Sequence, residues 1–231
     1  DYDAQLQMLL DPWEREPLDL YEFLAVRDIQ TAADQFRPVY EGLGGLDGYA
    51  SIEVSPRHAF DTEATITEAQ RLWRAVGRPN VMVKVPATAP GLRAIRYLIG
   101  EGINVNVTLL FSTAVYERVV EVYLAGLEDL LAGGGEISRV DSVASFFVSR
   151  IDSAIDPHVS RRLQGKVGIA NAKATYARFR ELFSGERWDG LSAQGANVQK
   201  VLWASTGTKN AAYPELMYVE GLIGPETVDT V

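Results

Sequence analysis

Cysteine is absent from this 231-residue chain, which excludes disulfides, thiolate metal sites and cysteine nucleophiles. Histidine is scarce, with only His58 and His158, which argues against a histidine-rich metal site. No apolar run reaches the roughly 18 residues that a membrane-spanning helix requires, and no signal-peptide pattern is present. We therefore expect no metal, no cofactor, no membrane partner and a cytoplasmic location.

Basic residues are in the minority, because 22 lysines and arginines stand against 31 aspartates and glutamates, for a net charge of −9. Such a surface repels polyanions, so it argues against nucleic acid and anionic membranes as partners. A phosphorylated substrate would need a local basic cluster within this acidic whole. The hydrophobic share of 47% and the charged share of 23% are those of an ordinary globular protein.

One stretch, Asn80-Val-Met-Val-Lys-Val-Pro-Ala-Thr88, combines a buried-strand pattern with a charge. Strand side chains alternate between faces, so its three valines share one side and Met82 and Lys84 share the other. A charged lysine near the end of a buried strand is costly unless its pKa falls or it gains a partner. A lowered pKa would make a nucleophilic amine suited to Schiff-base chemistry. From this stretch alone, an ion-paired or snorkelling lysine is the simpler interpretation.

Strand and helix periodicities alternate along the chain. Six strands are expected, at 49–54, 80–85, 103–109, 140–148, 201–205 and 217–223. Helices are expected to end near residue 10 and to cover 18–40, 61–75, 91–99, 113–131, 156–163, 169–183 and 191–198, with Ser112 and either Asp61 or Thr65 as caps.

The alternation indicates an α/β fold with a parallel sheet and crossover helices. We interpret it as a (β/α)8 TIM-type barrel, present as about six of the eight strand–helix units and forming one incomplete domain over residues 1–231. A doubly wound open sheet is the alternative. No glycine-rich strand–turn–helix fingerprint is present to support that alternative.

The polar side chains of several strands are expected to share the inward face of such a barrel. Where apolar residues must meet the helices, the alternation directs Glu53, Asn106 and Thr108 inward and Leu109 outward. In the strand 201–205 we expect Leu202 and Ala204 outside and Trp203 and Ser205 inside. The expected inward polar set is Lys84, Glu53, Asn106, Thr108, Ser145 and Ser205, and Phe147 shares the face of Ser145. Such a set forms either a structural hydrogen-bond network or a site for a polyhydroxylated ligand.

Basic residues follow two of the late strands. Arg150 comes after the strand 140–148, and Lys209 lies in the loop Ser205-Thr-Gly-Thr-Lys-Asn210 after the strand 201–205. Barrels often bind phosphate at loops after late strands, with backbone N–H groups and a cation. An ordinary polar loop with Lys209 in solvent fits the loop equally well.

Seven segments occur in order as DGYASIEVSP (47–56), NVMVKVPAT (80–88), GINVNVTLLFS (102–112), SVASFFVSR (142–150), GIANAKATY (168–176), LWASTGTKN (202–210) and YVEGLIGPETVDT (218–230). With these segments the chain resembles the transaldolase family, and its long bacterial subgroup in particular, over essentially its whole length. The resemblance implies a (β/α)8 barrel of the pentose phosphate pathway that needs no cofactor. Such an enzyme transfers a dihydroxyacetone unit from a ketose phosphate, fructose 6-phosphate or sedoheptulose 7-phosphate, to an aldose phosphate.

The resemblance also implies roles for individual residues. Lys84 falls on the Schiff-base lysine, Glu53 on the carboxylate that works with a catalytic water, and Thr108 on the residue that holds this water. The implied substrate-binding positions are Asn106 for a sugar hydroxyl, Ser145 and Phe147 for the wall, and Arg150, Ser205 and, in a looser alignment, Lys209 for the phosphate.

The chain departs from the family pattern at both ends. A strand whose aspartate serves in carbon–carbon bond cleavage, a second strand with a Ser-Asn-Pro motif, and the final helix all lack a match here. We therefore expect a fragment with little turnover of its own, because general acid–base help is worth roughly 10²–10⁴-fold.

Two other functions stay open. One is a different lysine aldolase of the same barrel type, such as fructose-6-phosphate aldolase. The other is an inactive fragment that binds sugar phosphates without a covalent adduct. The sequence also leaves open whether the parent protein is a homodimer or is fused to another domain.

Overall fold

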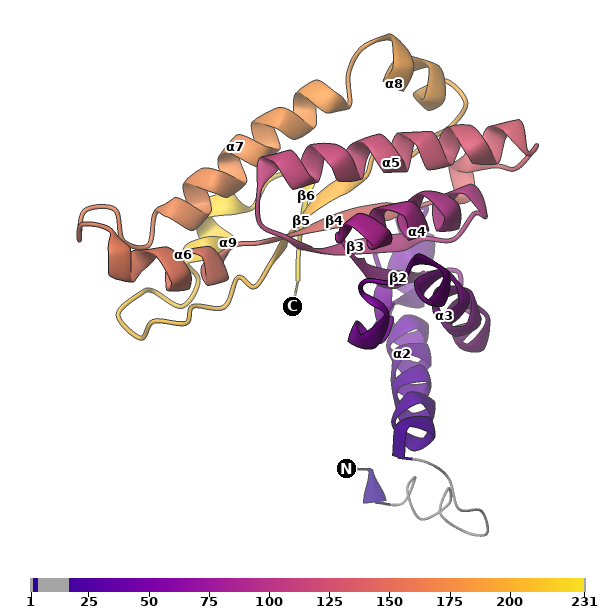
Figure 1. The fold of residues 1–231 in the computed structure, drawn as a ribbon, viewed down its shortest axis with the longest axis horizontal. Coiled ribbons are helices and arrows are strands. Elements are labelled where there is room, and N and C mark those ends of the chain that lie inside the picture. The colour runs from indigo at the N-terminus through magenta and orange to yellow at the C-terminus, as the bar shows by residue number, and fades with distance from the viewer. Residues whose placement is uncertain (1, 4–16, 231) are drawn as a thin grey trace.

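The computed structural model describes residues 2–3 and 17–230 and has an α/β fold built on one parallel sheet (Figure 1). The six strands pair in the order β1-β2-β3-β4-β5-β6, so that every strand lies beside its neighbour in sequence. The expected parallel sheet with crossover helices is thereby confirmed. The helix end expected near residue 10 lies outside the described residues.

The strands are β1 (Ala50–Glu53), β2 (Val81–Pro86), β3 (Val105–Leu110), β4 (Ser142–Phe147), β5 (Lys200–Ala204) and β6 (Thr227–Asp229). The α-helices are α2 (Pro17–Gly42), α3 (Thr62–Val76), α4 (Ala89–Gly100), α5 (Thr113–Ala132), α6 (Ser149–Ile155), α7 (Val167–Leu182), α8 (Glu186–Ser192) and α9 (Met217–Leu222). Short 3-10 turns, η1 (Pro56–His58), η2 (Ile137–Arg139) and η3 (Asp156–His158), lie in the connections.

The helices cover the outer face of the sheet, each packed on the next in the series α2, α3, α4, α5 and α7 (Figure 1). Between sheet and helices lies the main core, which includes the valines of β2 at positions 81, 83 and 85. The inner face of the sheet carries a second, smaller apolar cluster of Met82, Val143, Phe147, Leu202 and Ala204. The expected alternation of β2 is thus confirmed, because Met82 and the valines lie on opposite faces.

Helix caps form where the sequence predicts them. Asp61 accepts a hydrogen bond from the Ala64 amide and begins α3, and Ser112 accepts one from the Val115 amide and begins α5. Each cap satisfies an amide that the first helical turn leaves without a partner. Of the two cap candidates for α3, Asp61 is the one used.

The part of the chain after β4 differs from the expectation in four places. Residues 217–223 form helix α9 instead of a strand, because Tyr218 and Leu222, four residues apart, bury the same helical face. The last strand is β6, at Thr227–Asp229. In place of the helix expected at 156–163, the chain forms α6, which begins just after β4, and then η3. Helix α8 begins five residues earlier than the predicted segment 191–198 and overlaps its start.

The faces of β5 are the reverse of the prediction. Leu202 and Ala204 belong to the inner cluster, whereas Trp203 lies in the outer core and donates its indole N–H to the Leu222 carbonyl at 3.0 Å. A buried indole needs both a large apolar space and an acceptor, and α9 supplies both. The alternation of β5 alone carries no information about α9.

Strand β3 ends in an irregularity between Val107 and Leu110. Leu109 there adopts a left-handed backbone conformation with φ of 63°, which is strained for a residue with a side chain. Leu110 takes the place in the outer core that the regular alternation assigns to Leu109, whose side chain is 43% exposed. The expectation that Leu109 packs outward is wrong, because a bulge shifts the alternation by one residue.

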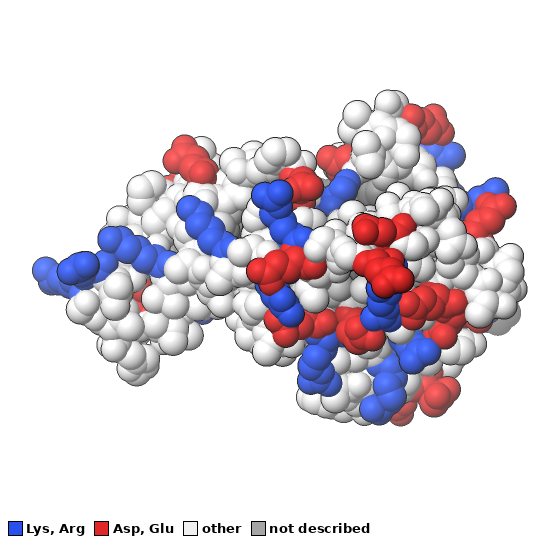
Figure 2. All heavy atoms as spheres, turned by 90° about the horizontal axis from the view of Figure 1, so that it is seen from above, with Lys and Arg blue, Asp and Glu red and all other residues white. Residues whose placement is uncertain are grey.

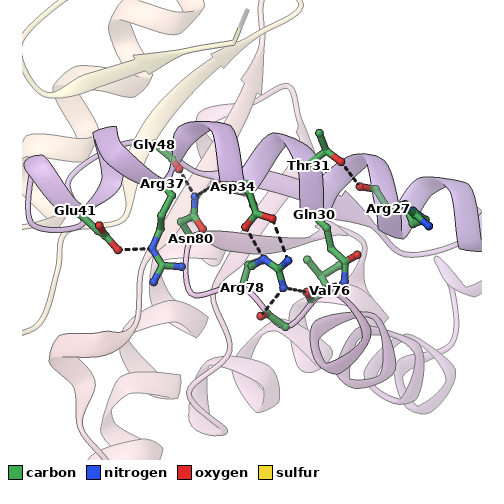
Figure 3. A network of polar contacts seen from close by, with 12 residues as sticks. Arg27, Gln30, Thr31, Asp34, Arg37, Glu41, Gly48, Val76, Arg78 and Asn80 are labelled. Carbon is green, nitrogen blue, oxygen red and sulfur yellow. Dashed lines mark hydrogen bonds and ion pairs between the residues drawn. The ribbon is translucent and has the colours of Figure 1, made fainter. Parts of the chain in front are cut away.

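Helix α2 is tied to the loops that precede β1 and β2 (Figure 3). The fully buried Asn80 amide donates to the carbonyls of Ala33 at 2.7 Å and Gly48 at 2.9 Å. Arg78 forms a two-pronged ion pair with Asp34, at 2.6 and 3.0 Å. The buried Asn80 bonds matter more for stability, because exposed ion pairs contribute little.

At the end of the sheet where the strands begin, an acid and a phenol join β1 to β4 across the inner face. The Tyr49 hydroxyl donates to Asp141 Oδ2 at 2.5 Å. Burial raises the pKa of the Asp141 carboxyl, although the Tyr49 hydroxyl and the nearby Lys200 oppose the rise. Burial, followed by the hydrogen bond to Asp141, also raises the pKa of Tyr49. Folding therefore makes the charged form of each group less favourable than it is in the unfolded chain.

We expect Asp141→Asn to be more stable relative to the unaltered chain at neutral pH than at about pH 3. Because the folded-state pKa of Asp141 is raised, its stabilising contribution is complete below the unfolded pKa of about 3.9 and is lost as pH rises through the folded pKa. The asparagine keeps an acceptor for the Tyr49 hydroxyl and carries no charge. Thermal unfolding of both proteins between pH 3 and 7 measures the effect.

Asp129→Asn is the matched control, because its hydrogen bond to Arg96 lowers the pKa of the Asp129 carboxyl. That group contributes stability above its unfolded pKa and loses it as pH falls through the folded pKa, so this variant should show the opposite trend. The same trend in both variants would contradict the assignment.

Gly91 allows α4 to approach the end of β2, because a Cβ there would lie 2.0 Å from the Pro86 carbonyl oxygen. We expect Gly91→Ala to lower the free energy of unfolding by about 1–3 kcal/mol, as overpacking does. Gly100→Ala in the same helix is the control, since its Cβ would meet Asp129 at 3.5 Å, an ordinary contact. Denaturant unfolding compares the two, and equal effects would contradict the steric explanation.

Candidate active site

Lys84 lies in β2 with polar residues on both neighbouring strands. The parallel register pairs Lys84 with Glu53 of β1 on one side and with Asn106 of β3 on the other. The Lys84 ammonium lies 3.7 Å from Glu53 Oε2, and the two side chains are 29% and 52% exposed. The ion pair considered for this lysine is therefore present, and the amine is reachable from solvent.

Asn106 is the centre of a buried chain of hydrogen bonds. Its Oδ1 accepts from the Ser145 hydroxyl of β4 at 2.6 Å, and its Nδ2 donates to the Ser51 hydroxyl of β1 at 3.1 Å. Asn106 and Ser145 are almost fully buried. The chain links strands on both sides of β2 and so surrounds the lysine position on the inner face.

Thr108 follows Asn106 on β3 and is buried. It pairs in register with Pro86, and its carbonyl accepts from the Ala87 amide at 3.0 Å. Two residues beyond Asn106 on the same strand, it lies at the end of β3 next to the strained Leu109.

A second group lies after β4. The Arg150 guanidinium stands over the ring of Phe147, 4.8 Å from its centroid, in a cation–π contact. Phe111 packs on the same Phe147 ring, with centroids 5.2 Å apart. The Phe147 ring, itself held by Phe111, therefore restricts where the charge of Arg150 lies.

Ser205 ends β5 in a left-handed conformation, with φ of 58°. Its hydroxyl lies 3.0 Å from that of the buried Ser149, and the Ser149 amide donates to the Ser205 carbonyl at 3.0 Å. Thr206 donates to Asp229 Oδ1 of β6 at 3.0 Å. Lys209 is exposed, with its ammonium close to Gly207. These contacts fix the start of the loop and leave Lys209 at its outer part.

The structure brings the predicted residues together as two groups at the carboxyl ends of the strands. Lys84, Glu53, Asn106, Thr108 and Ser145 form the first group, and Phe147, Arg150, Ser205 and Lys209 form the second. Within the described part of the chain, no hydrogen bond or ion pair joins the groups directly. Ser149 is the main addition, and its only signal in the sequence is its place between a strand end and Arg150.

Charge is distributed unevenly over the surface. Figure 2 shows basic side chains gathered at the end of the molecule where α6 and its connection to α7 lie, while both signs alternate elsewhere. Exposed Arg161, Arg162 and Lys166 occupy that connection, in sequence proximity to Arg150. A locally basic region thus exists on an acidic protein, as an anionic ligand requires.

Within residues 2–3 and 17–230, no group of three or more histidine, aspartate or glutamate side chains is placed to hold a metal ion. None of the helices among these residues has both the length and the apolar character needed to cross a bilayer.

A sequence model described as "Transaldolase/Fructose-6-phosphate aldolase" matches residues 1–231. The chain belongs to this family. Relatives named transaldolase include one from Trichodesmium erythraeum, which is 48% identical over the whole chain and 64% of its own length. "Transaldolase 2" of Nostoc punctiforme is 50% identical over 92% of this chain and 60% of its own length. "Transaldolase 1" of Streptomyces avermitilis is 51% identical over 90% of this chain and 57% of its own length.

The chain therefore spans about three fifths of the length of the curated relatives it matches. Family membership agrees with the resemblance read from the sequence motifs and with the parallel strand–helix repeats of the fold. The roles of the individual site residues in this member of the transaldolase/fructose-6-phosphate aldolase family remain predictions.

We expect Asn106→Ala to destabilise the fold by about 1–3 kcal/mol, because it leaves the buried Ser145 hydroxyl without its acceptor. Ser145→Ala should cost less, since the Asn106 carbonyl oxygen then loses one donor and the Ser51 bond persists. Urea unfolding of both variants measures the difference. A larger loss for Ser145→Ala than for Asn106→Ala would show that Asn106 is not the centre of this network.

Proposed function

We propose that the site forms a Schiff base between Lys84 and a ketose phosphate and takes part in transaldolase-type transfer of a dihydroxyacetone unit. The observation that carries the proposal is the position of the Lys84 ammonium, 3.7 Å from the Glu53 carboxylate and beside Asn106 in register. An amine next to a carboxylate has both the nucleophile and a proton acceptor for imine formation.

The chemistry follows from these two groups. The unprotonated Lys84 amine attacks the C2 carbonyl of the ketose, and the resulting carbinolamine loses the C2 oxygen as water to give the iminium. Glu53 takes the proton that the Lys84 ammonium gives up before the attack, the C2 oxygen takes a second proton from the attacking nitrogen, and Glu53 returns its proton to the departing hydroxyl. Thr108 and Asn106 lie on the same face of the next strand, where they can hydrogen-bond the water and a sugar hydroxyl.

Cleavage of the C3–C4 bond then requires a base that takes the proton of the C4 hydroxyl. The aldose phosphate leaves, and the bonding electrons pass to the iminium to give the enamine of dihydroxyacetone on Lys84. This enamine attacks the aldehyde of an acceptor aldose phosphate, and hydrolysis releases the new ketose phosphate. The motif resemblance assigns the base to an aspartate that has no match in this chain.

The phosphate end of the substrate is assigned to the second group. Arg150 supplies a charge held by the Phe147 ring, Ser205 a hydroxyl in a fixed left-handed turn, and Lys209 a second cation. A dianionic phosphate bonds well to an arginine fork and to an ammonium group. Ser145 and Phe147 then form the wall between the two groups.

We expect borohydride reduction in the presence of dihydroxyacetone or fructose 6-phosphate to trap an adduct on Lys84, because reduction converts the iminium to a stable secondary amine. Peptide mass spectrometry locates the adduct. Lys84→Ala should abolish it, and Lys173→Ala, which removes an exposed lysine on α7, should leave it unchanged. A full-strength adduct in Lys84→Ala, or label spread evenly over surface lysines, would contradict the proposal.

A lysine aldolase that releases free dihydroxyacetone is the second candidate, because the matching family is described by both activities. The relatives named transaldolase favour transfer to an acceptor. Measuring free dihydroxyacetone with and without an added aldose phosphate separates the two. Transfer predicts that free dihydroxyacetone does not accumulate and that a new ketose phosphate forms only with the acceptor, whereas the aldolase predicts release of free dihydroxyacetone without it.

A further inference from the structure

Two aspartates after the carboxyl end of β4, one helical turn apart, each accept one hydrogen bond from a glycine amide and one from a tyrosine hydroxyl. Asp152 in α6 accepts from the Gly168 amide at 2.8 Å and from the Tyr218 hydroxyl at 2.9 Å. Asp156 in η3 accepts from the Gly165 amide at 3.0 Å and from the Tyr213 hydroxyl at 2.6 Å.

Each carboxylate therefore uses one oxygen for a glycine amide near the start of α7, Gly168 within the helix and Gly165 just before it, and the other oxygen for a tyrosine from the segment after β5. In the described part of the chain neither aspartate has an arginine or lysine within ion-pair distance. Charge-assisted hydrogen bonds from an amide and a phenol are the alternative means of satisfying a carboxylate.

The inner and outer members of this pair differ in burial. Asp152 and Tyr218 are each 1% exposed, so their contact belongs to the core between α6, α7 and α9. Tyr213 is only half-buried and lies against Gly165, where a Cβ would meet its ring at 3.0 Å. The hydrogen bond to Asp156 raises the pKa of Tyr213 to about 12, so this phenol stays a donor at neutral pH.

The outer contact joins the two segments that carry the predicted phosphate ligands. Arg150 lies in the first turn of α6, six residues before Asp156. Ser205 and Lys209 precede Tyr213 in the loop after β5. The Ser149–Ser205 bonds hold the start of that loop, and Tyr213–Asp156 holds its far end. Lys209 lies between these two attachments.

We propose that Tyr213 and Asp156 are positioning residues that keep the loop of Lys209 against α6, so that Lys209 and Arg150 meet one phosphate monoester together. This inference rests on the proposed function of the site. It assigns to the Tyr213–Asp156 contact part of the preference of the site for phosphorylated over unphosphorylated ligands. A loop fixed at both ends loses less conformational entropy when it binds the ligand than one fixed at a single end. The contact acts on the phosphate end of the ligand and leaves Lys84 untouched.

Tyr213→Phe tests the inference, since it removes one hydroxyl and keeps the ring against Gly165. The dissociation constant of inorganic phosphate, measured by isothermal titration calorimetry, should rise about five- to tenfold, the scale of the net contribution of one ordinary hydrogen bond. The half-saturating fructose 6-phosphate concentration for Lys84 trapping should rise by the same factor. The corresponding value for dihydroxyacetone, which has no phosphate, should not change.

Tyr176→Phe is the matched control, because it removes a tyrosine–carboxylate bond of 2.8 Å to Glu226, next to the start of β6 and so at the opposite end of the sheet. It should leave both ligands unaffected. Asp156→Asn keeps an acceptor for the Tyr213 hydroxyl without the charge, so it should fall between the unaltered chain and Tyr213→Phe.

The outcomes separate this inference from the proposed function. Equal shifts for both ligands, no shift, or no measurable phosphate binding by the unaltered chain would overturn the positioning role. Phosphate binding that weakens in Tyr213→Phe supports that role even if no Lys84 adduct forms, in which case only the Schiff-base proposal fails.

Discussion

Parallel pairing of β1, β2 and β3 sets the arrangement of the site. Because the register places Glu53, Lys84 and Asn106 side by side, their side chains leave the sheet in one direction at one level. A shift of one residue in β2 would turn Lys84 into the main core and a valine into the site. Burial of the valines on the outer face opposes such a shift, so the core that stabilises the sheet also aims the lysine.

The inner face of the sheet has an apolar part and a polar part. Met82, Val143, Phe147, Leu202 and Ala204 fill one part, and the Ser51–Asn106–Ser145 chain fills another. A buried polar chain is stable when each member finds a partner, and here both ends of the Asn106 amide do. The same hydrogen bonds that join β1, β3 and β4 leave a polar surface beside Lys84.

The connections at the carboxyl end of the sheet are held by carboxylates that accept hydrogen bonds from backbone amides and side-chain hydroxyls. Asp152 and Asp156 organise the connections after β4 and β5, and Asp229 receives Thr206 of the second connection. Arg150, Arg161 and Arg162, close by in sequence, are exposed and form no ion pair within residues 2–3 and 17–230. An acidic protein can therefore carry a basic site without a basic overall charge.

From its sequence alone this protein could be assigned parallel strand–helix repeats, the faces of β2, the caps Asp61 and Ser112, and a lysine beside polar strand residues. These features follow from short-range periodicity and from single residues whose chemistry allows few alternatives. Only the tertiary structure decided the outward turn of Trp203, the bulge at Leu109, the helix at 217–222 and the paired aspartate contacts. Each of these depends on a partner far away in sequence, such as the Leu222 carbonyl for Trp203 or Tyr213 for Asp156. The short-range pattern of apolar and polar residues does not indicate which distant residue that partner is.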